Sequence, residues 1–293
     1  MHRRLLLLAG SGLPLLSVAH MVLAADQTYL KVLYAGSLVN LMERGLGPAF
    51  DKSDHGQFRG YAGGSNKLAN EIKARLRQAD VFISANPHVN IDLMGAANGD
   101  WVSWYVTFAE SALVIGYNPS SRFASDIKSK PWYEVLRQPG IRIGRTDPKL
   151  DPKGKLTIDL FQKAAEVYKL SNLSQDVLGT PENPDQVVPE ENLIGRLQSG
   201  QLDVGFFYST ETADLNIQAI KLPPEVTLSA HYTVTVLRDA PNATGAEQFI
   251  EFLLGDAGKA LMRRHGLDLV TPSIEGDQGK VPASVRSAVN TTK

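Results

Sequence analysis

The sequence predicts an α/β protein with two lobes. Its 293 residues are 43% hydrophobic and 8% aromatic, which makes the chain too long for one compact core and too apolar for disorder. Short strand-like runs alternate along it with amphipathic helical patterns, and this alternation is typical of α/β folds. We find no internal repeat that would indicate a solenoid or a propeller.

The first part of the chain contains three strand-like runs. They occupy residues 30–34, 57–62 and 80–85. Apolar residues at helical spacing follow the first run from Leu38 to Phe50 and the second from Leu68 to Leu76. We therefore expect two consecutive strand–helix units and a third strand.

The remainder of the chain predicts longer extended runs and further helices. Extended or strand-like runs occupy 108–117, 141–144, 203–207 and 226–237. Helical patterns cover 156–170 and 246–265, the latter interrupted at Gly255. The tail after Thr271 contains Gly276, Gly279 and Pro282 and predicts a loosely structured end.

Composition excludes several classes of function. The formal net charge is −1 and no run of basic residues exceeds two, so no nucleic acid partner is expected. The absence of Cys excludes thiolate catalysis, thiolate metal sites and disulfides.

The first 24 residues predict a cleaved signal peptide. Arg3 and Arg4 precede a broken apolar stretch, and small residues end at Ala24. A membrane anchor is the alternative, but Gly10, Gly12 and Pro14 leave no uninterrupted span of about 20 apolar residues. An exported, mildly acidic protein without disulfides indicates a periplasmic location.

Two serines follow the first two predicted strands. Ser37 and Ser65 each lie where a strand passes into a helix, so each is a plausible N-cap. The ends of successive parallel strands meet at one edge of a sheet, where helix N-termini offer N–H groups to an anion. A phosphate-binding loop is the rival interpretation, but neither GxxxxGK[ST] nor GxGxxG occurs.

Three further polar residues stand at similar positions in the second half. Asp151 precedes Pro152 at a predicted helix start, and a helix N-cap is its alternative role. Glu190 opens a short helix and could equally be an exposed first-turn carboxylate that favours the helix dipole. Tyr208 follows the predicted strand 203–207.

The order of these segments resembles the tungstate- and molybdate-binding proteins of ABC importers over roughly residues 30–270. The motifs that carry the resemblance are Tyr34-Ala35-Gly36-Ser37-Leu38, Gly64-Ser65, Ala79-Asp80-Val81, Trp132-Tyr133-Glu134-Val135-Leu136, Asp147-Pro148, Asp151-Pro152-Lys153-Gly154 and Ser199-Gly200-Gln201-Leu202-Asp203 leading to Phe207-Tyr208. Lys153 departs from the pattern, because archaeal members often have Cys after this Asp-Pro. We expect that change to leave the ligand-binding residues untouched.

The resemblance implies a two-lobed periplasmic-binding-protein fold of type II with the ligand between lobes joined by two extended crossings. The first lobe would comprise 29–108 and 238–290, and the second 109–237. The binding residues would be Ser37, Ser65, Asp151, Glu190 and Tyr208, with Glu191 as a one-residue alternative to Glu190. The partners would be molybdate or tungstate and a membrane permease, bound by a monomer that needs no cofactor and does no chemistry.

Two carboxylates would repel an ordinary tetrahedral dianion, each by about 4 kcal/mol per ligand charge at roughly 4 Å. Hexavalent molybdenum and tungsten are large, electron-poor centres that can accept further oxygen ligands, whereas sulfur and phosphorus cannot. Asp151 and Glu190 are therefore expected to coordinate the metal atom of the oxyanion and to reject sulfate.

Two alternatives remain open. One is a receptor for sulfate or another tetrahedral oxyanion. The other is a secreted serine hydrolase that pairs Ser37 or Ser65 with one of His55, His88, His231 and His265, although no GxSxG motif surrounds either serine.

Overall fold

The structure is a computed structural model that describes residues 29–53 and 56–291. The predicted signal peptide, 1–24, lies outside the described residues. Within the described part, no helix combines the length and apolar character needed to cross a bilayer.

The first lobe is built from strand–helix units, as predicted. Its elements are β1 (Tyr29–Ala35), η1 (Gly36–Leu38), η2 (Leu41–Leu46), α1 (Gly47–Asp51), β2 (Gln57–Gly63), α2 (Ser65–Lys73), β3 (Val81–Ser84), α3 (Pro87–Ile91) and η3 (Ala96–Asn98). Strand β1 lies between β2 and β3 and runs parallel to both, with Ala35 opposite Gly63. The parallel pairing brings the carboxyl ends of these strands to one edge of the sheet.

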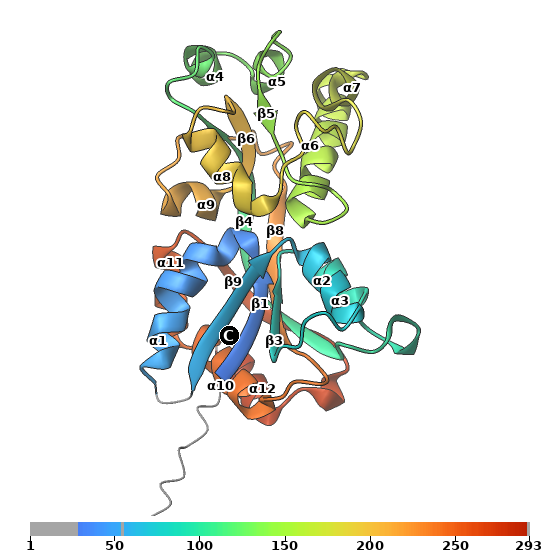
Figure 1. Ribbon diagram of the computed structural model, residues 1–293, viewed down its shortest axis with the longest axis vertical. Helices are drawn as coiled ribbons and strands as arrows, with labels where there is room; N and C mark the ends of the chain where they lie inside the picture. The colour runs from blue at the N-terminus through green and yellow to red at the C-terminus, as the bar shows by residue number, and fades with distance from the viewer. Residues whose placement is uncertain (1–28, 54–55, 292–293) are drawn as a thin grey trace, which may run out of the picture.

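The second lobe contains α4 (Ala124–Ser129), α5 (Trp132–Val135), β5 (Ile143–Gly144), α6 (Pro152–Tyr168), α7 (Leu173–Leu178), α8 (Glu190–Gln198), β6 (Val204–Tyr208), α9 (Ser209–Asp214) and β7 (Ala219–Lys221). Strands β5 and β6 are parallel, and β6 pairs antiparallel with β4. This lobe occupies the upper part of Figure 1, and β1, β2 and β3 occupy the lower part.

Two long strands run from one lobe into the other: β4 (Trp104–Tyr117) and β8 (Ser229–Val236). They pair antiparallel, and the register shifts between Thr107 and Ala109. The sheet order is β2-β1-β3-β8-β4-β6-β5, so β4 and β8 stand at its centre (Figure 1). Both strands join the two lobes as extended backbone.

The chain returns to the first lobe through α10 (Ala243–Leu254), α11 (Asp256–Arg264), β9 (Asp268–Gly276), η4 (Gln278–Lys280) and α12 (Ala283–Thr291). The prediction of a loosely structured tail was therefore wrong. Strand β9 pairs with β4 at the sheet edge, where a proline such as Pro272 is tolerated. Val285 and Val289 lie four residues apart in α12 and are both buried, which gives this helix an apolar face.

Candidate functional site

Ser37 and Ser65 lie at the same edge of the first lobe's sheet, directly after β1 and β2. Neither caps its helix: Ser37 lies inside η1, and Ser65 is the first residue of α2 behind the N-cap Gly64. The N-cap prediction was wrong for both. Instead, the Ser37 hydroxyl lies 2.8 Å from that of Tyr232, and Ser65 Oγ accepts a hydrogen bond from the Ala85 N–H. Because Ser65 Oγ accepts this bond, its own proton can be donated to a ligand.

Asp151 and Glu190 come from the starts of two helices in the second lobe. Asp151 is the N-cap of α6 and accepts a hydrogen bond from Lys153 N at 2.7 Å, so its capping role is confirmed. Glu190 is the first residue of α8, but its side chain is only 8% exposed, so it is not the solvated carboxylate of the alternative interpretation. Its neighbour Glu191 is exposed.

The two lobes meet at two glycines. A Cβ at Gly36 would lie 2.6 Å from Glu190 Cγ, and a Cβ at Gly64 would lie 2.5 Å from the Leu150 carbonyl oxygen. That carbonyl also accepts a hydrogen bond from Lys67 N in the first turn of α2. Only glycine permits this approach, which brings the serine-bearing edge of the first lobe against Asp151 and Glu190.

A cavity of about 280 Å³ lies at this junction. Gly64 and Lys67 of the first lobe line it together with residues of the second lobe, Asp151 and Glu190 among them. Two of the predicted site residues therefore share one interlobe cavity with the helix that begins at Ser65.

The centre of the second-lobe site is a buried lysine. Lys153 is 1% exposed, and its Nζ lies 2.9 Å from Glu190 Oε1 and 2.8 Å from Glu211 Oε1. The expectation that Lys153 would leave the predicted ligand-binding residues untouched was wrong. The side chain of Lys153 points from the first turn of α6 between the starts of α8 and α9, which carry these two glutamates.

Glu211 is itself fixed by the backbone. Its Oε2 accepts a hydrogen bond from Tyr208 N at 2.7 Å, which is the glutamate half of a capping box at the start of α9. The ring of Tyr208 packs edge-on against that of Tyr232, with centroids 6.2 Å apart. The hydroxyl of Tyr232 in turn contacts that of Ser37, so a ring contact and a hydrogen bond together connect Tyr208 to the first lobe.

Burial and like charges dominate the electrostatics of this cluster. Burial raises the pKa of Asp151 well above its usual range, and the nearby Glu190 carboxylate raises it further. Burial likewise raises the pKa of Glu211 to about 7. Burial alone would lower the pKa of Lys153, but the carboxylates of Glu190, Glu211 and Asp151 outweigh it, so Lys153 stays charged.

Two buried polar atoms of the cluster receive no hydrogen bond from an N–H or alcohol donor among the described residues: Glu190 Oε2 and the Tyr208 hydroxyl. Burying a polar group without a partner costs roughly 1–3 kcal/mol, so such atoms are rare in native proteins. Both belong to residues that the sequence assigned to ligand binding. Their lack of partners is what a site that receives polar atoms from a ligand requires.

Sequence reasoning missed Glu211 and Tyr232 and misjudged Lys153. A signal for Glu211 exists, because a Glu at the third position of a helix is typical of a capping box. Tyr232 lies in the middle of β8, and nothing local distinguishes it. Among the described residues, no group of three or more His, Cys, Asp or Glu side chains is arranged to hold a free metal ion.

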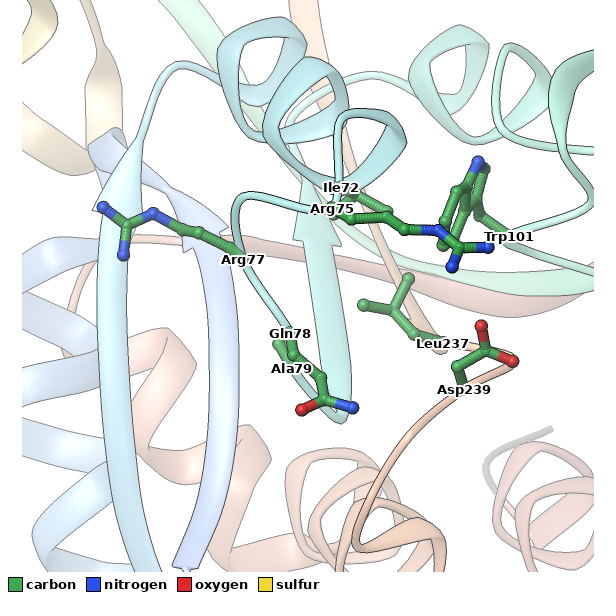
Figure 2. Close-up of a pocket in the computed structure, with 8 residues that line it drawn as sticks. All are labelled: Ile72, Arg75, Arg77, Gln78, Ala79, Trp101, Leu237 and Asp239. Carbon is green, nitrogen blue, oxygen red and sulfur yellow. The ribbon is translucent and has the colours of Figure 1, made fainter.

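A second cavity, of about 290 Å³, lies on the first lobe and contains none of the predicted site residues (Figure 2). Its cations are engaged by aromatic rings: the Arg75 guanidinium carbon lies 5.5 Å from the Trp101 ring centroid and that of Arg77 lies 3.3 Å from the Tyr61 centroid. None of the buried, unpartnered polar side-chain atoms found among the described residues belongs to its lining.

Among the described residues, no hydrogen bond joins a histidine to Ser37 or Ser65, and the candidate His55 lies outside these residues. Ser37 contacts a tyrosine hydroxyl and Ser65 a backbone N–H, as described above. His231 faces Glu110 at 3.7 Å, and His265 contacts Asp214 at 2.9 Å.

Comparisons with known proteins bear on this arrangement. The family described as bacterial extracellular solute-binding protein matches residues 30–268. A molybdate/tungstate-binding protein of Thermococcus kodakarensis is 27% identical over 90% of this chain and 88% of its own length.

Two solved structures share the fold. The periplasmic molybdate-binding protein of Azotobacter vinelandii matches with a TM-score of 0.63 at 16% identity, covering 82% of this chain and 99% of its own. Iron-bound HitA of Pseudomonas aeruginosa matches with a TM-score of 0.57 at 17% identity, over 90% and 98%. The predicted two-lobed fold is confirmed. Since proteins named for molybdate and for iron share it, the fold does not by itself select the ligand.

Proposed function

Because the chain belongs to the bacterial extracellular solute-binding protein family, we propose that it is a periplasmic receptor that binds molybdate or tungstate and delivers it to an ABC importer permease. The observation that carries the proposal is the pair of buried, unpartnered atoms at the interlobe cluster, Glu190 Oε2 and the Tyr208 hydroxyl. The name of the Thermococcus kodakarensis relative supplies the ligand.

Hydroxyl and N–H donors would bind the oxo groups. Ser37, Ser65 and Tyr208 offer hydroxyl protons, each worth about 1.5–3 kcal/mol when bonded to a charged group. Association itself costs about 4–15 kcal/mol, so nanomolar binding, near −12 kcal/mol, requires a nearly complete and preorganised set of donors. The contact of Ser37 with Tyr232 and of Ser65 with Ala85 provides such preorganisation.

The carboxylates would bind the metal atom. Asp151 and Glu190 approach each other closely enough for their charges to interact, which is costly unless an electron-poor centre or a proton lies between them. A hexavalent tungsten or molybdenum atom is such a centre, and a sulfur atom is not. The proposal therefore includes rejection of sulfate, and the alternative of a sulfate receptor predicts the opposite preference.

Closure of the lobes over the ligand would create the form that the permease binds. The hinge would lie in β4 and β8, the extended strands that enter both lobes, with boundaries near residues 108 and 238. Ligand contacts from both lobes exist together only when the lobes are closed, so binding shifts the population towards the closed form. The ligand would be released unchanged by a monomer without a cofactor.

Titration calorimetry with tungstate, molybdate, sulfate and phosphate tests the proposal. We expect nanomolar binding of the first two and at least about a thousandfold weaker binding of the others, a difference of about 4 kcal/mol. Equal binding of sulfate would favour the general oxyanion receptor, and binding of none would overturn the proposal.

Turnover of generic ester or phosphoester substrates that is lost on Ser37→Ala would instead favour a hydrolase.

Small-angle X-ray scattering with and without tungstate should show a smaller radius of gyration in the bound form. Native mass spectrometry of protein from the periplasm should show the bound oxyanion.

A further inference from the structure

The proposed ligand site contains an internal cation that faces carboxylates from two other helices. Lys153 Nζ contacts Glu190 Oε1 at 2.9 Å and Glu211 at 2.8 and 3.0 Å. An ammonium has three donors and no acceptor, so these contacts engage its bonding capacity within the protein. The lysine is therefore poorly placed to serve as one more donor to an oxyanion.

These contacts form a chain of fixed positions. The backbone N–H of Tyr208 donates a hydrogen bond to Glu211 Oε2. The Lys153 ammonium donates one hydrogen bond to Glu211 Oε1 and another to Glu190 Oε1. The other oxygen of Glu190, Oε2, is buried and receives no hydrogen bond from an N–H or alcohol donor in the described part of the chain. One carboxylate oxygen of Glu190 is thus anchored by the ammonium, and the second is not.

We propose that Lys153 is a positioning residue, which anchors Glu190 by one oxygen so that the other is presented to the metal atom of the bound oxyanion. This inference rests on the proposed function. A flexible glutamate with two unanchored oxygens would lose side-chain entropy on binding. The anchored form avoids that cost.

The Lys153 ammonium also offsets the negative charge of the surrounding carboxylates. The groups that face the cluster are Asp151 from α6, Glu190 from α8, Glu211 from α9, Tyr208 from β6 and Tyr232 from β8. Lys67 of α2 lines the adjoining cavity. Without Lys153, three carboxylates would meet an incoming dianion with no buried cation among them.

A buried ion pair is weak support for stability, because removing both charges from water costs about as much as their attraction returns. Replacing Lys153 could therefore alter stability in either direction, and stability alone does not reveal its role. The role is read from the coupling between Lys153 and Glu190 in ligand binding.

The experiment is a double-mutant cycle for tungstate binding with the variants Lys153→Met, Glu190→Gln and the combination. If Lys153 acts through Glu190, each single variant weakens binding about tenfold or more, and the combination is no weaker than the worse single variant. Independent losses that multiply in the combination would overturn the inference. So would wild-type affinity in Lys153→Met.

Lys155→Met is the matched control, because Lys155 lies on the same helix in an exposed ion pair with Asp159. We expect it to bind tungstate within about twofold of wild type. Should Lys153→Met fail to fold, the cycle is repeated in Lys153→Met/Glu211→Gln, which removes one charge of each sign. A fully restored affinity in that variant would mean that Lys153 only neutralises Glu211, and would overturn the inference.

X-ray absorption of the tungsten-loaded variants gives a second readout, which a purely structural lysine would not change. The Lys153→Met protein should lose one of the oxygen neighbours that the wild type adds to tungstate, and Lys155→Met should keep it. An unchanged spectrum for Lys153→Met contradicts the positioning role alone. Failure of the wild-type protein to bind tungstate would instead overturn the proposed function.

Discussion

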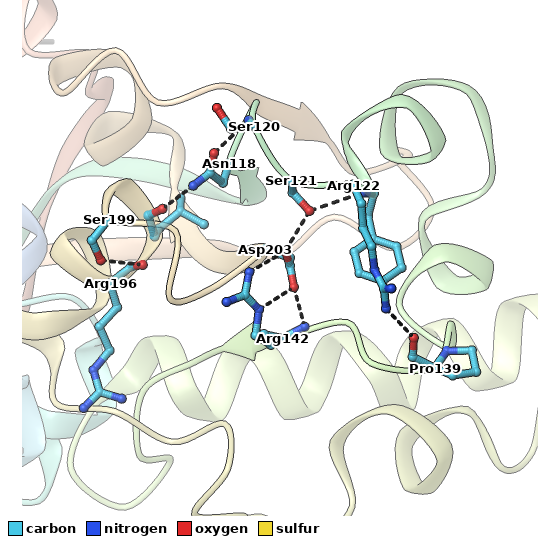
Figure 3. A network of polar contacts seen from close by, with 11 residues as sticks. Asn118, Ser120, Ser121, Arg122, Pro139, Arg142, Arg196, Ser199 and Asp203 are labelled. Atoms are coloured by element: carbon cyan, nitrogen blue, oxygen red, sulfur yellow. Dashed lines mark hydrogen bonds and ion pairs between the residues drawn. The ribbon is translucent and has the colours of Figure 1, made fainter.

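Asp203 and Asp151 are both buried aspartates, but their surroundings differ. Asp203, 3% exposed, accepts hydrogen bonds from Ser121 Oγ and from the backbone and guanidinium of Arg142 (Figure 3). Burial alone would raise the pKa of Asp203, but these bonds outweigh it and lower the pKa. Asp151, 7% exposed, accepts a bond from Lys153 N in its own helix, and its pKa is raised.

The difference separates a carboxylate with a complete set of hydrogen-bond partners from the one that we propose for ligand binding. Both carboxylate oxygens of Asp203 accept hydrogen bonds. One bond comes from Ser121, and the other connects the start of β6 to Arg142 in the loop before β5. Asp151 faces the Glu190 carboxylate, whose Oε2 receives no hydrogen bond from an N–H or alcohol donor among the described residues. A protein keeps such an incomplete arrangement when a ligand completes it.

The largest expected effect concerns the incomplete cluster. Asp151→Asn combined with Glu190→Gln removes both charges that would coordinate the metal atom. Tungstate affinity should fall by more than a hundredfold, about 3 kcal/mol or more, while sulfate binding is unchanged or improved. Calorimetry measures the affinities for tungstate and for sulfate. Tungstate binding at wild-type strength would contradict the assignment of Asp151, in contrast to Asp203, to ligand binding.

The donors of the first lobe should have the next largest effect. Ser37→Ala and Ser65→Ala should each weaken tungstate binding by about 1.5–3 kcal/mol in calorimetry. The loss at Ser65 should come with lower thermal stability, because its Oγ also accepts from Ala85 N. If both variants bind as wild type does, these hydroxyls serve only the contacts seen within the protein.

The complete network should affect stability instead of binding. Asp203→Asn should lower the free energy of unfolding by about 1–3 kcal/mol in urea titration, because it weakens the contacts to Arg142. Tungstate affinity should stay within about twofold of wild type. A large loss of affinity would show that the network supports the site.

The smallest effect is a pH dependence of opposite sign at the two clusters. Asp203 has a lowered pKa, so the stability it contributes is complete above its unfolded value near 3.9 and is lost as the pH falls through the folded value. Glu211 has a pKa raised from 4.5 to about 7, so its contribution is complete below pH 4.5 and is lost as the pH rises to about 7.

Unfolding of the unliganded protein over this pH range tests the Glu211 effect. Between about pH 5 and 7.5 the wild type should become less stable, and Glu211→Gln should reduce that slope. An identical slope in the variant would show that Glu211, facing Lys153 and Glu190, does not titrate differently in the folded state.

Local patterns in the sequence predicted most of the elements because their periodicity reflects burial on one face. The strand–helix units that carry Ser37 and Ser65 are examples, and so is the helix start at Asp151. Strand β9 was missed because Pro272 and Gly276 oppose a strand locally and pairing with β4 overrides them.

The electrostatic part of the site was less predictable. Lys153 and Glu211 are distant in sequence from Glu190. The three residues form one cluster because the N-terminal ends of α6, α8 and α9 lie close together in the fold. A lysine in the first turn of a helix is usually solvated, so its burial is a tertiary property that no local pattern carries. The sequence could place Asp151 and Glu190, but neither Glu211 nor the cation between the two glutamates.

Anomalous diffraction at the tungsten absorption edge, from crystals grown with tungstate, tests the central claim most directly. The account predicts one strong peak between the lobes, within coordination distance of Asp151 and Glu190 Oε2 and enclosed by the hydroxyls of Ser37, Ser65 and Tyr208. The account would be contradicted if no peak lay between the lobes and the tungsten bound elsewhere, for example in the arginine-lined cavity of Figure 2.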